Sequence, residues 1–469
     1  MTAKSCAKCP NKSQNQKLGN RLTVSAIAIV LLITAANINH TFTTFQRQQL
    51  ISISAKTFAS SKYLPINTGA VETIKQQDFS RIDNLAKQIH YSGFSVTELA
   101  NILAENATSE SEKARIIYAW ITQHITYDIP AFNQAISHDI YPDISPEKVL
   151  RDRTTICSGF SNLYYALATA MNLDSVIVIG YAKGATPAGD ERFQEINHAW
   201  NAVKIDQAWY LLDATWGAGS IINNEFISEY NPSYFAINPQ EFINSHYPQD
   251  DGWQLLSQRF TRNEFDNLPI ISNRFYELDL ELVSHQKYQI NTSNRVDIKL
   301  KAPKNIVALA SLQENSQEIP QTTVLVSRHG DNLTINVAPP RAGTYDLTIY
   351  AKQQDDSEQY DEIIKYQILA TNSVVELPKT SAHFHLHQAS LIEPLTANLK
   401  SNWTTYFKVI VPEAIDVQIV NSTTQHWTSL NGYGNYFAGN VDIQSGNIFI
   451  VAKFPGDERY WQLIEYQAN

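Results

Sequence analysis

Hydrophobic positions between residues 77 and 126 recur at the spacing of an amphipathic helix. The spacing is clearest in the stretch SEKARIIYAWITQHITYD, which begins at Ser111. Residues three and four positions apart share one face of a helix, so this face is expected to pack inward. Its members are Ile116, Ile117, Trp120, Ile121, His124 and Ile125. Ser111 is a suitable N-cap, because its hydroxyl can accept a hydrogen bond from the first turn.

The pattern changes from helix to strand after residue 157. The stretch CSGFSNLYYALATAMNL keeps helical spacing at Phe160, Leu163, Tyr164, Leu167 and Met171. Short runs rich in β-branched and aromatic residues follow, namely DSVIVIGYAKG, INHAWNAVKI and AWYLLDATW, and they predict strands. Helices followed by a sheet indicate an α+β domain, which we place at residues 77–270.

Alternation of apolar and polar residues dominates the chain from residue 271 onward. Runs such as VDIKLKAP and FKVIVPEAIDVQIV, separated by turn-forming residues, are typical of β-sandwich modules. The stretch GTYDLTIYAKQQDDSEQYDEIIKYQILA is echoed later by GNIFIVAKFPGDERYWQLIEYQA. The matching positions are Ala351-Lys352 with Ala452-Lys453, Tyr360 with Tyr460, and Tyr366 with Tyr466. This internal repeat predicts two related β-sandwich-like modules, at residues 271–372 and 373–469.

The N-terminus has the arrangement of an export signal. Residues 1–21 contain lysines and an arginine but no acidic residue, and the apolar stretch LTVSAIAIVLLITAANI follows at residues 22–38. A basic flank before an apolar segment predicts a signal peptide or an N-terminal membrane anchor, with residues 39–76 as a linker. The rest of the chain is then expected outside the cytoplasm, secreted or held to the membrane by its N-terminus.

Charge and cysteine content narrow the possible functions. The formal net charge of −10, with no basic cluster in the body, argues against a nucleic-acid partner. Cys6 and Cys9 precede the apolar segment, and we interpret them as part of a flexible leader. The body is left with Cys157, so no disulfide framework is expected there.

The surroundings of Cys157 are those that a nucleophilic thiol requires. Such a cysteine must be largely thiolate, must have a histidine to exchange its proton, and needs a third group to orient that histidine. Cys157 begins the predicted helix, where unpaired N–H groups favour an anion. His198 lies on one predicted strand and Asp213 ends the next. A hairpin between these strands would bring carboxylate and imidazole together.

These segments resemble a known family. Cys157 at the start of a helix, GYAKG after a strand, and NHAWNAVKIDQAWYLLDATWGAG are similar to the transglutaminase-like superfamily, and more narrowly to its kyphoscoliosis peptidase branch. The resemblance covers about residues 110–220, and the C-terminal modules also resemble modules of that branch. It implies a papain/transglutaminase-like core with Cys157 as nucleophile, His198 as general base and acid, and Asp213 as the orienting residue.

Residues near this triad are candidates for supporting roles. Tyr127 is a candidate second oxyanion donor, with a core tyrosine as the alternative. Trp200 and Trp216 are expected to wall the site, whereas Trp209 fits ordinary sheet core equally well. The stretch WGAG predicts close backbone approach at Gly217 and Gly219.

Two alternatives to this site are weaker. A papain-like site fits less well, because Arg151 stands where those enzymes place the glutamine of the oxyanion hole. The stretch HFHLHQ would place His383, His385 and His387 on one face of a strand, a geometry that suits zinc or copper. No acidic cluster supports that hypothesis, so we assign no metal and no cofactor to the site.

The leading functional hypothesis is an exported cysteine-dependent acyl-transfer enzyme that acts on protein or peptide amides through a thioester. Water as acceptor gives a peptidase and a lysine amine gives a transglutaminase, and we favour hydrolysis. The alternative is a non-catalytic envelope protein that uses the transglutaminase-like domain and the β modules as a scaffold for binding or assembly. A metalloprotein built on the histidine strand is the third hypothesis.

Overall fold

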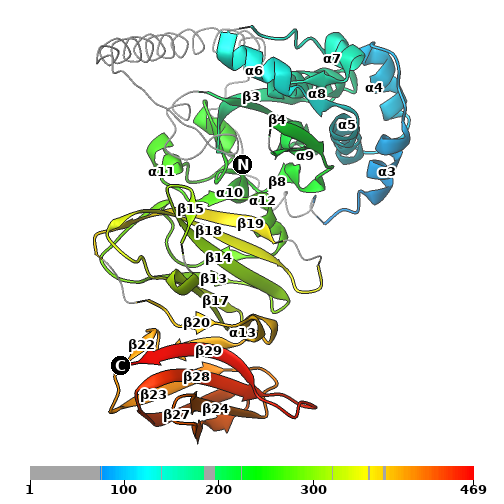
Figure 1. Ribbon diagram of the computed structural model, residues 1–469. Coiled ribbons are helices and arrows are strands. Elements are labelled where there is room, and N and C mark those ends of the chain that lie inside the picture. The colour runs from blue at the N-terminus through cyan, green and yellow to red at the C-terminus, as the bar shows by residue number, and fades with distance from the viewer. Residues whose placement is uncertain are drawn as a thin grey trace, which may run out of the picture. The chain divides into compact units, whose positions relative to one another are not determined.

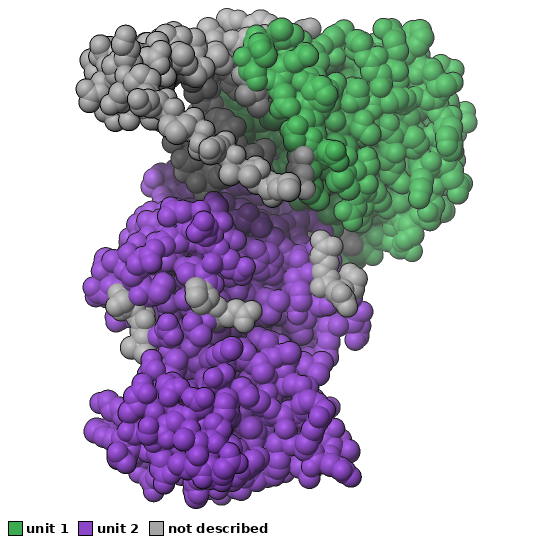
Figure 2. Space-filling model, viewed as in Figure 1, with its two compact units in different colours: residues 1–181, 194–236, 248–253 green, residues 182–193, 237–247, 254–469 purple. Residues whose placement is uncertain are grey.

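The computed structural model describes residue 74 and residues 76–138, 140–183, 196–222, 224–319, 321–356, 360–372 and 376–469. The predicted leader with Cys6 and Cys9, the apolar segment and most of the linker lie outside these residues. The chain divides into two compact units (Figure 2). The first comprises residues 1–181, 194–236 and 248–253, and the second comprises residues 182–193, 237–247 and 254–469. No helix among the described residues has the length and apolar character needed to span a membrane.

Helices of the first unit form where the apolar spacing predicts them. The expected helical region separates into α3 (Ser80–Gln88), α4 (Val96–Ala104) and α5 (Glu110–His124). The N-cap of α5 is Ser109, whose side chain accepts a hydrogen bond from the Glu112 N–H, so the prediction of Ser111 as the cap is wrong. Ser111 instead lies buried in the first turn.

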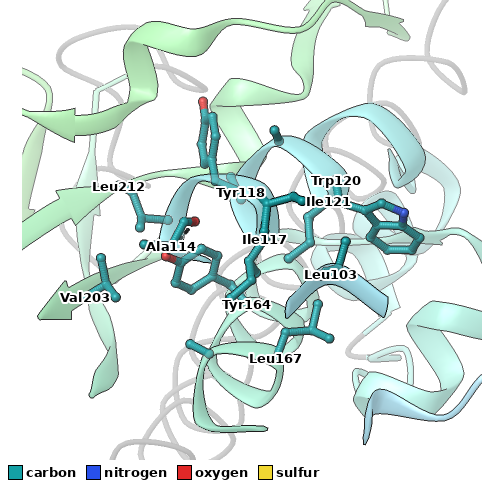
Figure 3. Packing of buried hydrophobic residues seen from close by; sticks show 14 of the residues in the cluster. Leu103, Ala114, Ile117, Tyr118, Trp120, Ile121, Tyr164, Leu167, Val203 and Leu212 are labelled. Carbon is teal, nitrogen blue, oxygen red and sulfur yellow. Dashed lines mark hydrogen bonds between the residues drawn. The ribbon is translucent and has the colours of Figure 1, made fainter. Parts of the chain in front are cut away.

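The core of the first unit lies between α5 and α8 (Cys157–Ala170), as Figure 3 shows. Trp120 and Ile121 on α5 and Tyr164 and Leu167 on α8 are fully buried. Burying a large apolar side chain stabilises the fold by about 1.5–3 kcal/mol. This packing therefore holds the start of α8 firmly in place.

An antiparallel sheet covers α8, with strand order β8-β5-β4-β3 along part of its width. Its strands are β3 (Ser175–Ala182), β4 (His198–Ile205), β5 (Ala208–Leu212) and β8 (Phe235–Ile237). The predicted strands are confirmed. The hairpin between β4 and β5 is tight because Asp206 and Gln207 both adopt positive φ, as a two-residue turn of the hairpin type requires.

Shorter elements complete the region before the β modules. They are β1 (Thr126–Tyr127), α6 (Ile129–His138), α7 (Pro146–Asp152), β2 (Thr154–Thr155), α9 (Ala214–Gly217), β6 (Gly219–Ile222), β7 (Glu225–Ser228), η3 (Pro232–Tyr234), α10 (Pro239–Phe242), β9 (His246–Pro248), η4 (Asp251–Gln254) and α11 (Arg262–Asp266).

Two β-sandwich modules make up most of the second unit (Figure 1). The first β module contains β10 (Ile270–Ile271), α12 (Asn273–Glu277), β11 (Glu281–Leu282), β12 (Gln289–Thr292), β13 (Val296–Lys301), β14 (Ile306–Glu314), β15 (Gln317–Glu318), η5 (Gln321–Thr323), β16 (Val324–His329), β17 (Asn332–Val337), β18 (Gly343–Gln353) and β19 (Asp361–Ala370). The second β module contains β20 (Lys379–Thr380), α13 (Ala382–Leu386), β21 (Ser390–Glu393), β22 (Asn398–Leu399), β23 (Trp403–Ile410), β24 (Asp416–Asn421), β25 (His426–Ser429), β26 (Asn431–Tyr433), β27 (Tyr436–Ile443), β28 (Gly446–Lys453) and β29 (Trp461–Ala468).

The two β modules share one topology strand for strand. The sheets of the first β module run β10-β19-β18-β14-β15 and β11-β13-β17-β16, and those of the second run β20-β29-β28-β24-β25 and β21-β23-β27-β26. In both, a short strand pairs in parallel with the last strand. Tyr366 and Tyr466, matched in the sequence repeat, are both buried in their cores. The predicted α+β core followed by β-sandwich modules is thus confirmed, while the predicted boundaries stay predictions.

The histidine stretch forms helix α13 and not the expected strand, so the predicted geometry is wrong. Ser381 caps the helix by accepting from the Phe384 N–H, and Phe384 is buried in the core. A helix places residues four apart on one face, and His383 and His387 stack on the aromatic rings of Trp461 and Phe454. His385 instead lies beside Thr380, with Nε2 and Oγ1 3.1 Å apart. The three imidazoles therefore do not share one face.

Candidate active site

Cys157 is the first residue of α8, as the sequence predicts. Ile156, the N-cap, is extended, and its carbonyl oxygen accepts from the N–H groups of Gly159 and Phe160. Gly159 is needed here because a Cβ atom would lie 1.9 Å from Thr155 Oγ1. The thiol residue is 8% exposed. Unpaired N–H groups at the start of α8 favour negative charge on the sulfur or on a substrate oxygen beside it.

Both carboxylate oxygens of Asp213 make hydrogen bonds. It ends β5, is fully buried, and acts as the N-cap of α9. Its Oδ1 accepts from the N–H groups of Thr215 and Trp216 at 2.8 and 3.1 Å. Its Oδ2 lies 2.7 Å from His198 Nε2. Both carboxylate oxygens are thus engaged, and the imidazole is fixed in orientation.

His198, at the start of β4, links this carboxylate to the thiol. Its burial disfavours the imidazolium, but the charge of Asp213 and hydrogen bonds with Asp213 and Cys157 raise the pKa of His198 to about 10. Because Nε2 is on Asp213, the second ring nitrogen, Nδ1, is the atom that can exchange a proton with the sulfur. The structure therefore brings Cys157, His198 and Asp213 together.

Two tryptophans lie against the imidazole. Trp200 stacks on His198 with ring centroids 6.1 Å apart, and Trp216 lies at 5.6 Å. Trp209 instead packs edge-on against Trp253. Of the candidate wall residues, Trp200 and Trp216 contact His198 and exclude water from the charged pair.

Tyr127 lies beside the site on β1, which pairs in parallel with β2, so that Tyr127 is opposite Thr155. Burial raises the pKa of Tyr127 well above its usual value, and the negative charges of Cys157 and Asp213 add to this effect. Its hydroxyl therefore stays protonated and can act as a donor. The ring also packs against Phe132 and Phe226, so the position fits both the oxyanion and the core alternatives.

The predicted close approach of the backbone after Asp213 is confirmed. A Cβ atom on Gly217 would lie 2.1 Å from the hydroxyl oxygen of Tyr118. On Gly219, where φ is +149°, it would lie 2.1 Å from the carbonyl oxygen of Ile227.

Arg115 supports the candidate active site, although the sequence pattern did not reveal this residue. Arg115 is 4% exposed, and its guanidinium donates twice to the Asp83 carboxylate, at 2.7 and 2.8 Å. It also donates to the Pro232 carbonyl oxygen and the Tyr230 hydroxyl. The next residues of that segment include Tyr234, whose carbonyl oxygen accepts from the Asp213 N–H.

Asn201 is a second supporting residue that the sequence pattern did not reveal. It is fully buried on β4, and its Nδ2 donates to the carbonyl oxygens of Ser161 on α8 and Val176 on β3. This amide fastens α8, which begins with Cys157, to β4, which begins with His198. The available signal was a polar residue between the apolar Trp200 and Ala202.

Two family models match parts of this chain. Residues 97–214 match the family model described as the transglutaminase-like superfamily, and residues 262–375 match the KY-like, immunoglobulin-like domain. The first range contains Cys157, His198 and Asp213.

Curated relatives also match the chain. The kyphoscoliosis peptidases of Mus musculus and Homo sapiens are each 30% identical to the chain, over 62% of the chain and 43% of the relative. Hillarin of Drosophila melanogaster is 30% identical over 45% of the chain and 26% of the relative. The chain thus spans less than half the length of these relatives.

Proposed function

We propose that this chain, which carries a transglutaminase-like domain and a KY-like immunoglobulin-like domain, is a cysteine-dependent acyl-transfer enzyme that acts on protein or peptide amides. The proposal rests on one observation. His198 is bonded to Asp213 at 2.7 Å and contacts Cys157, which lies at a helix N-terminus. This contact favours catalysis over a non-catalytic scaffold.

The acyl-transfer step follows from these positions. The Cys157 thiolate attacks the amide carbonyl carbon, and the carbonyl oxygen becomes an oxyanion beside the Cys157 N–H and the Tyr127 hydroxyl. The His198 imidazolium donates its proton to the leaving nitrogen, the C–N bond breaks, and a thioester with Cys157 remains. Asp213 stabilises the imidazolium and keeps its ring oriented.

The second step regenerates the thiol. A water or amine loses a proton to neutral His198 and attacks the thioester, which releases the acyl group and returns the sulfur to its starting state. We favour water as the acceptor, because the similar mouse and human proteins are named peptidases.

The test uses the full chain with an unfolded protein substrate and a labelled primary amine. Hydrolysis predicts new protein N-termini and no label in the product, whereas amine transfer predicts incorporated label. Cys157→Ser should abolish either reaction, while Ser158→Ala beside it should retain it. Equal turnover by Cys157→Ser and the parent would contradict the proposal.

We also propose that the enzyme works outside the cytoplasm, on the basis of the basic residues 1–21 and the apolar residues 22–38. Protease added to intact expressing cells, with the outer envelope opened where one exists, should then digest the β modules. Digestion that occurs only after the cells are lysed would contradict this localisation.

A further inference from the structure

A β-hairpin follows directly after the candidate active-site turn. Strands β6 and β7 pair antiparallel, and the N–H groups of Glu229 and Asn231 donate to the carbonyl oxygens of Ala218 and Gly217. These bonds continue the pairing back to the α9 turn that holds Asp213. The hairpin is therefore attached rigidly to the orienting carboxylate.

The pairing register decides which side chains share a face. Ile221 lies opposite Phe226, while Ile222 lies opposite Glu225. Directly opposed residues of an antiparallel pair project to the same side, and neighbours along a strand project to opposite sides. Ile221 and Phe226 thus share one face, and Ile222 lies on the other.

The face that carries Ile221 and Phe226 continues into the candidate active site. The Phe226 ring lies 6.2 Å from the Tyr127 ring, which lies 5.8 Å from that of Phe132. Tyr127 pairs with Thr155, two residues before Cys157. Burial raises the pKa of the Tyr127 hydroxyl, and the charge of Cys157 adds to this effect. We call Tyr127, Phe132, Ile221 and Phe226 the apolar wall.

The apolar wall ends in an exposed side chain. Ile221 remains 46% exposed, although Phe226 and Tyr127 beside it pack onto the core. No member of the apolar wall carries a charge. An apolar surface that begins at Tyr127, which pairs two residues before Cys157, and ends in an exposed isoleucine is chemically matched to an apolar side chain.

We propose that the apolar wall is a specificity subsite that receives a bulky apolar side chain of the polypeptide substrate, next to the amide that Cys157 attacks. This inference rests on the proposed function, because it assigns the substrate class of that site. Burial of an apolar substrate side chain against Ile221 should favour leucine or phenylalanine over aspartate or serine by about tenfold or more in rate constant.

Ile222 provides a matched control for Ile221. It is the adjacent residue, has the same side chain and is 54% exposed, but projects from the opposite face of the hairpin. Ile221→Ser and Ile222→Ser should therefore change stability by similarly small amounts. Only Ile221→Ser should change selectivity.

The test labels Cys157 in the full chain with peptidyl chloromethyl ketones that carry Leu, Phe, Ser or Asp beside the reacting carbon. The sulfur displaces chloride from the methylene carbon, so the measurement needs no turnover. We expect the parent and Ile222→Ser to react about tenfold faster with the apolar reagents, and Ile221→Ser to lose that preference.

The outcomes separate the two proposals. Equal rates for all four reagents in the parent, or equal selectivity in Ile221→Ser and Ile222→Ser, would overturn the subsite. If Ile221→Ser lowers the unfolding midpoint but leaves selectivity unchanged, other residues of this protein cover the apolar wall. That result would also overturn the subsite. Iodoacetamide labelling that is unaffected by removal of the His198 imidazole would instead refute the acyl-transfer proposal.

Discussion

At the scale of single residues, Asp213 of the candidate site is fully buried, and both of its carboxylate oxygens make hydrogen bonds. Asp213 accepts from two backbone N–H groups and bonds His198, so its charge is compensated although it is inaccessible to water. That fixed charge keeps the imidazole protonated well above the usual pH range of histidine. In the proposed mechanism, this charged imidazole serves as the acid at neutral pH.

Replacement of Asp213 by Asn should lower the pH at which the site loses activity. In the parent the pKa of His198 is about 10, so the imidazolium persists through neutral pH and is lost as pH rises through 10. Without the carboxylate, burial still lowers the pKa of His198 and only Cys157 opposes it, so the imidazolium is lost at lower pH. We expect kcat/KM at pH 8 to fall about 100-fold.

The measurement is the pH profile of kcat/KM, with Asp206→Asn as the control, because Asp206 is an exposed residue of the β4–β5 turn.

The raised pKa of His198 also predicts how the stability of the fold depends on pH. The stabilisation from charged His198 should be complete below about pH 6.5 and should disappear as pH rises through 10. A parent and Asp213→Asn with identical alkaline limbs would disprove the assigned orienting role.

Removal of the imidazole should slow the reaction of the thiol. In His198→Ala the sulfur loses the cation that stabilises its thiolate, so alkylation of Cys157 by iodoacetamide at pH 6–7 should slow about tenfold or more. His426, exposed in the second β module, supplies the control His426→Ala, which should leave the rate unchanged. Equal rates in parent and His198→Ala would mean that Cys157 is a packing residue.

At the scale of elements, one buried guanidinium holds several segments together. Arg115 on α5 binds Asp83 on α3 and the segment around Pro232, and it lies over the rings of Phe79 and Phe235. Such an ion pair is costly to break, because the remaining Asp83 carboxylate, 18% exposed, is only poorly hydrated. The packing of α3, α5 and the segment around Pro232 thus depends on Arg115.

Arg115→Met should therefore destabilise the first unit by about 3–5 kcal/mol, as the loss of one partner of a buried ion pair does. Arg81→Met is the matched control on the same helix bundle, since Arg81 pairs with Glu112 at 57% side-chain exposure. It should cost less than about 1 kcal/mol. Urea unfolding followed by amide hydrogen exchange in α5 measures both variants. Similar losses in the two would contradict the structural role of Arg115.

At the scale of the whole molecule, the two β modules are joined through a strand of the first. Leu325 on β16 belongs to the hydrophobic core of the second β module. Beside it, the Arg328 N–H donates to Ser390 Oγ and the Ser327 hydroxyl donates to the Leu391 carbonyl oxygen. The order of the second β module therefore depends in part on the first.

Leu325→Ala should destabilise the second β module by about 2–5 kcal/mol, because the substitution leaves a cavity in its core. Amide hydrogen exchange should then rise in β28 and β29 while β18 and β19 keep their protection. Leu333→Ala, equally buried but in the core of the first β module, should give the opposite pattern. Faster exchange in β18 and β19 alone in Leu325→Ala would contradict the shared core.

Much of the fold was predictable because it depends on local periodicity. Apolar spacing predicted α5 and α8, runs rich in β-branched and aromatic residues predicted β3, β4 and β5, and the repeat predicted two related modules. The histidine stretch shows the limit of this reasoning. Its alternation resembles a strand, but the burial of Phe384 and the cap at Ser381 select a helix. Tertiary contacts therefore outweigh local pattern in so short a segment.

The sequence by itself determined which residue types are available for catalysis and in which elements they stand, because helix starts and strand ends are encoded by neighbouring residues. Tertiary structure alone decided that His198 Nε2 meets Asp213, that Arg115 is buried, and that Ile221 shares a face with Phe226 while Ile222 does not. These facts depend on distances between segments far apart in the chain. Such distances are set by the packing of the whole core, which no local pattern contains.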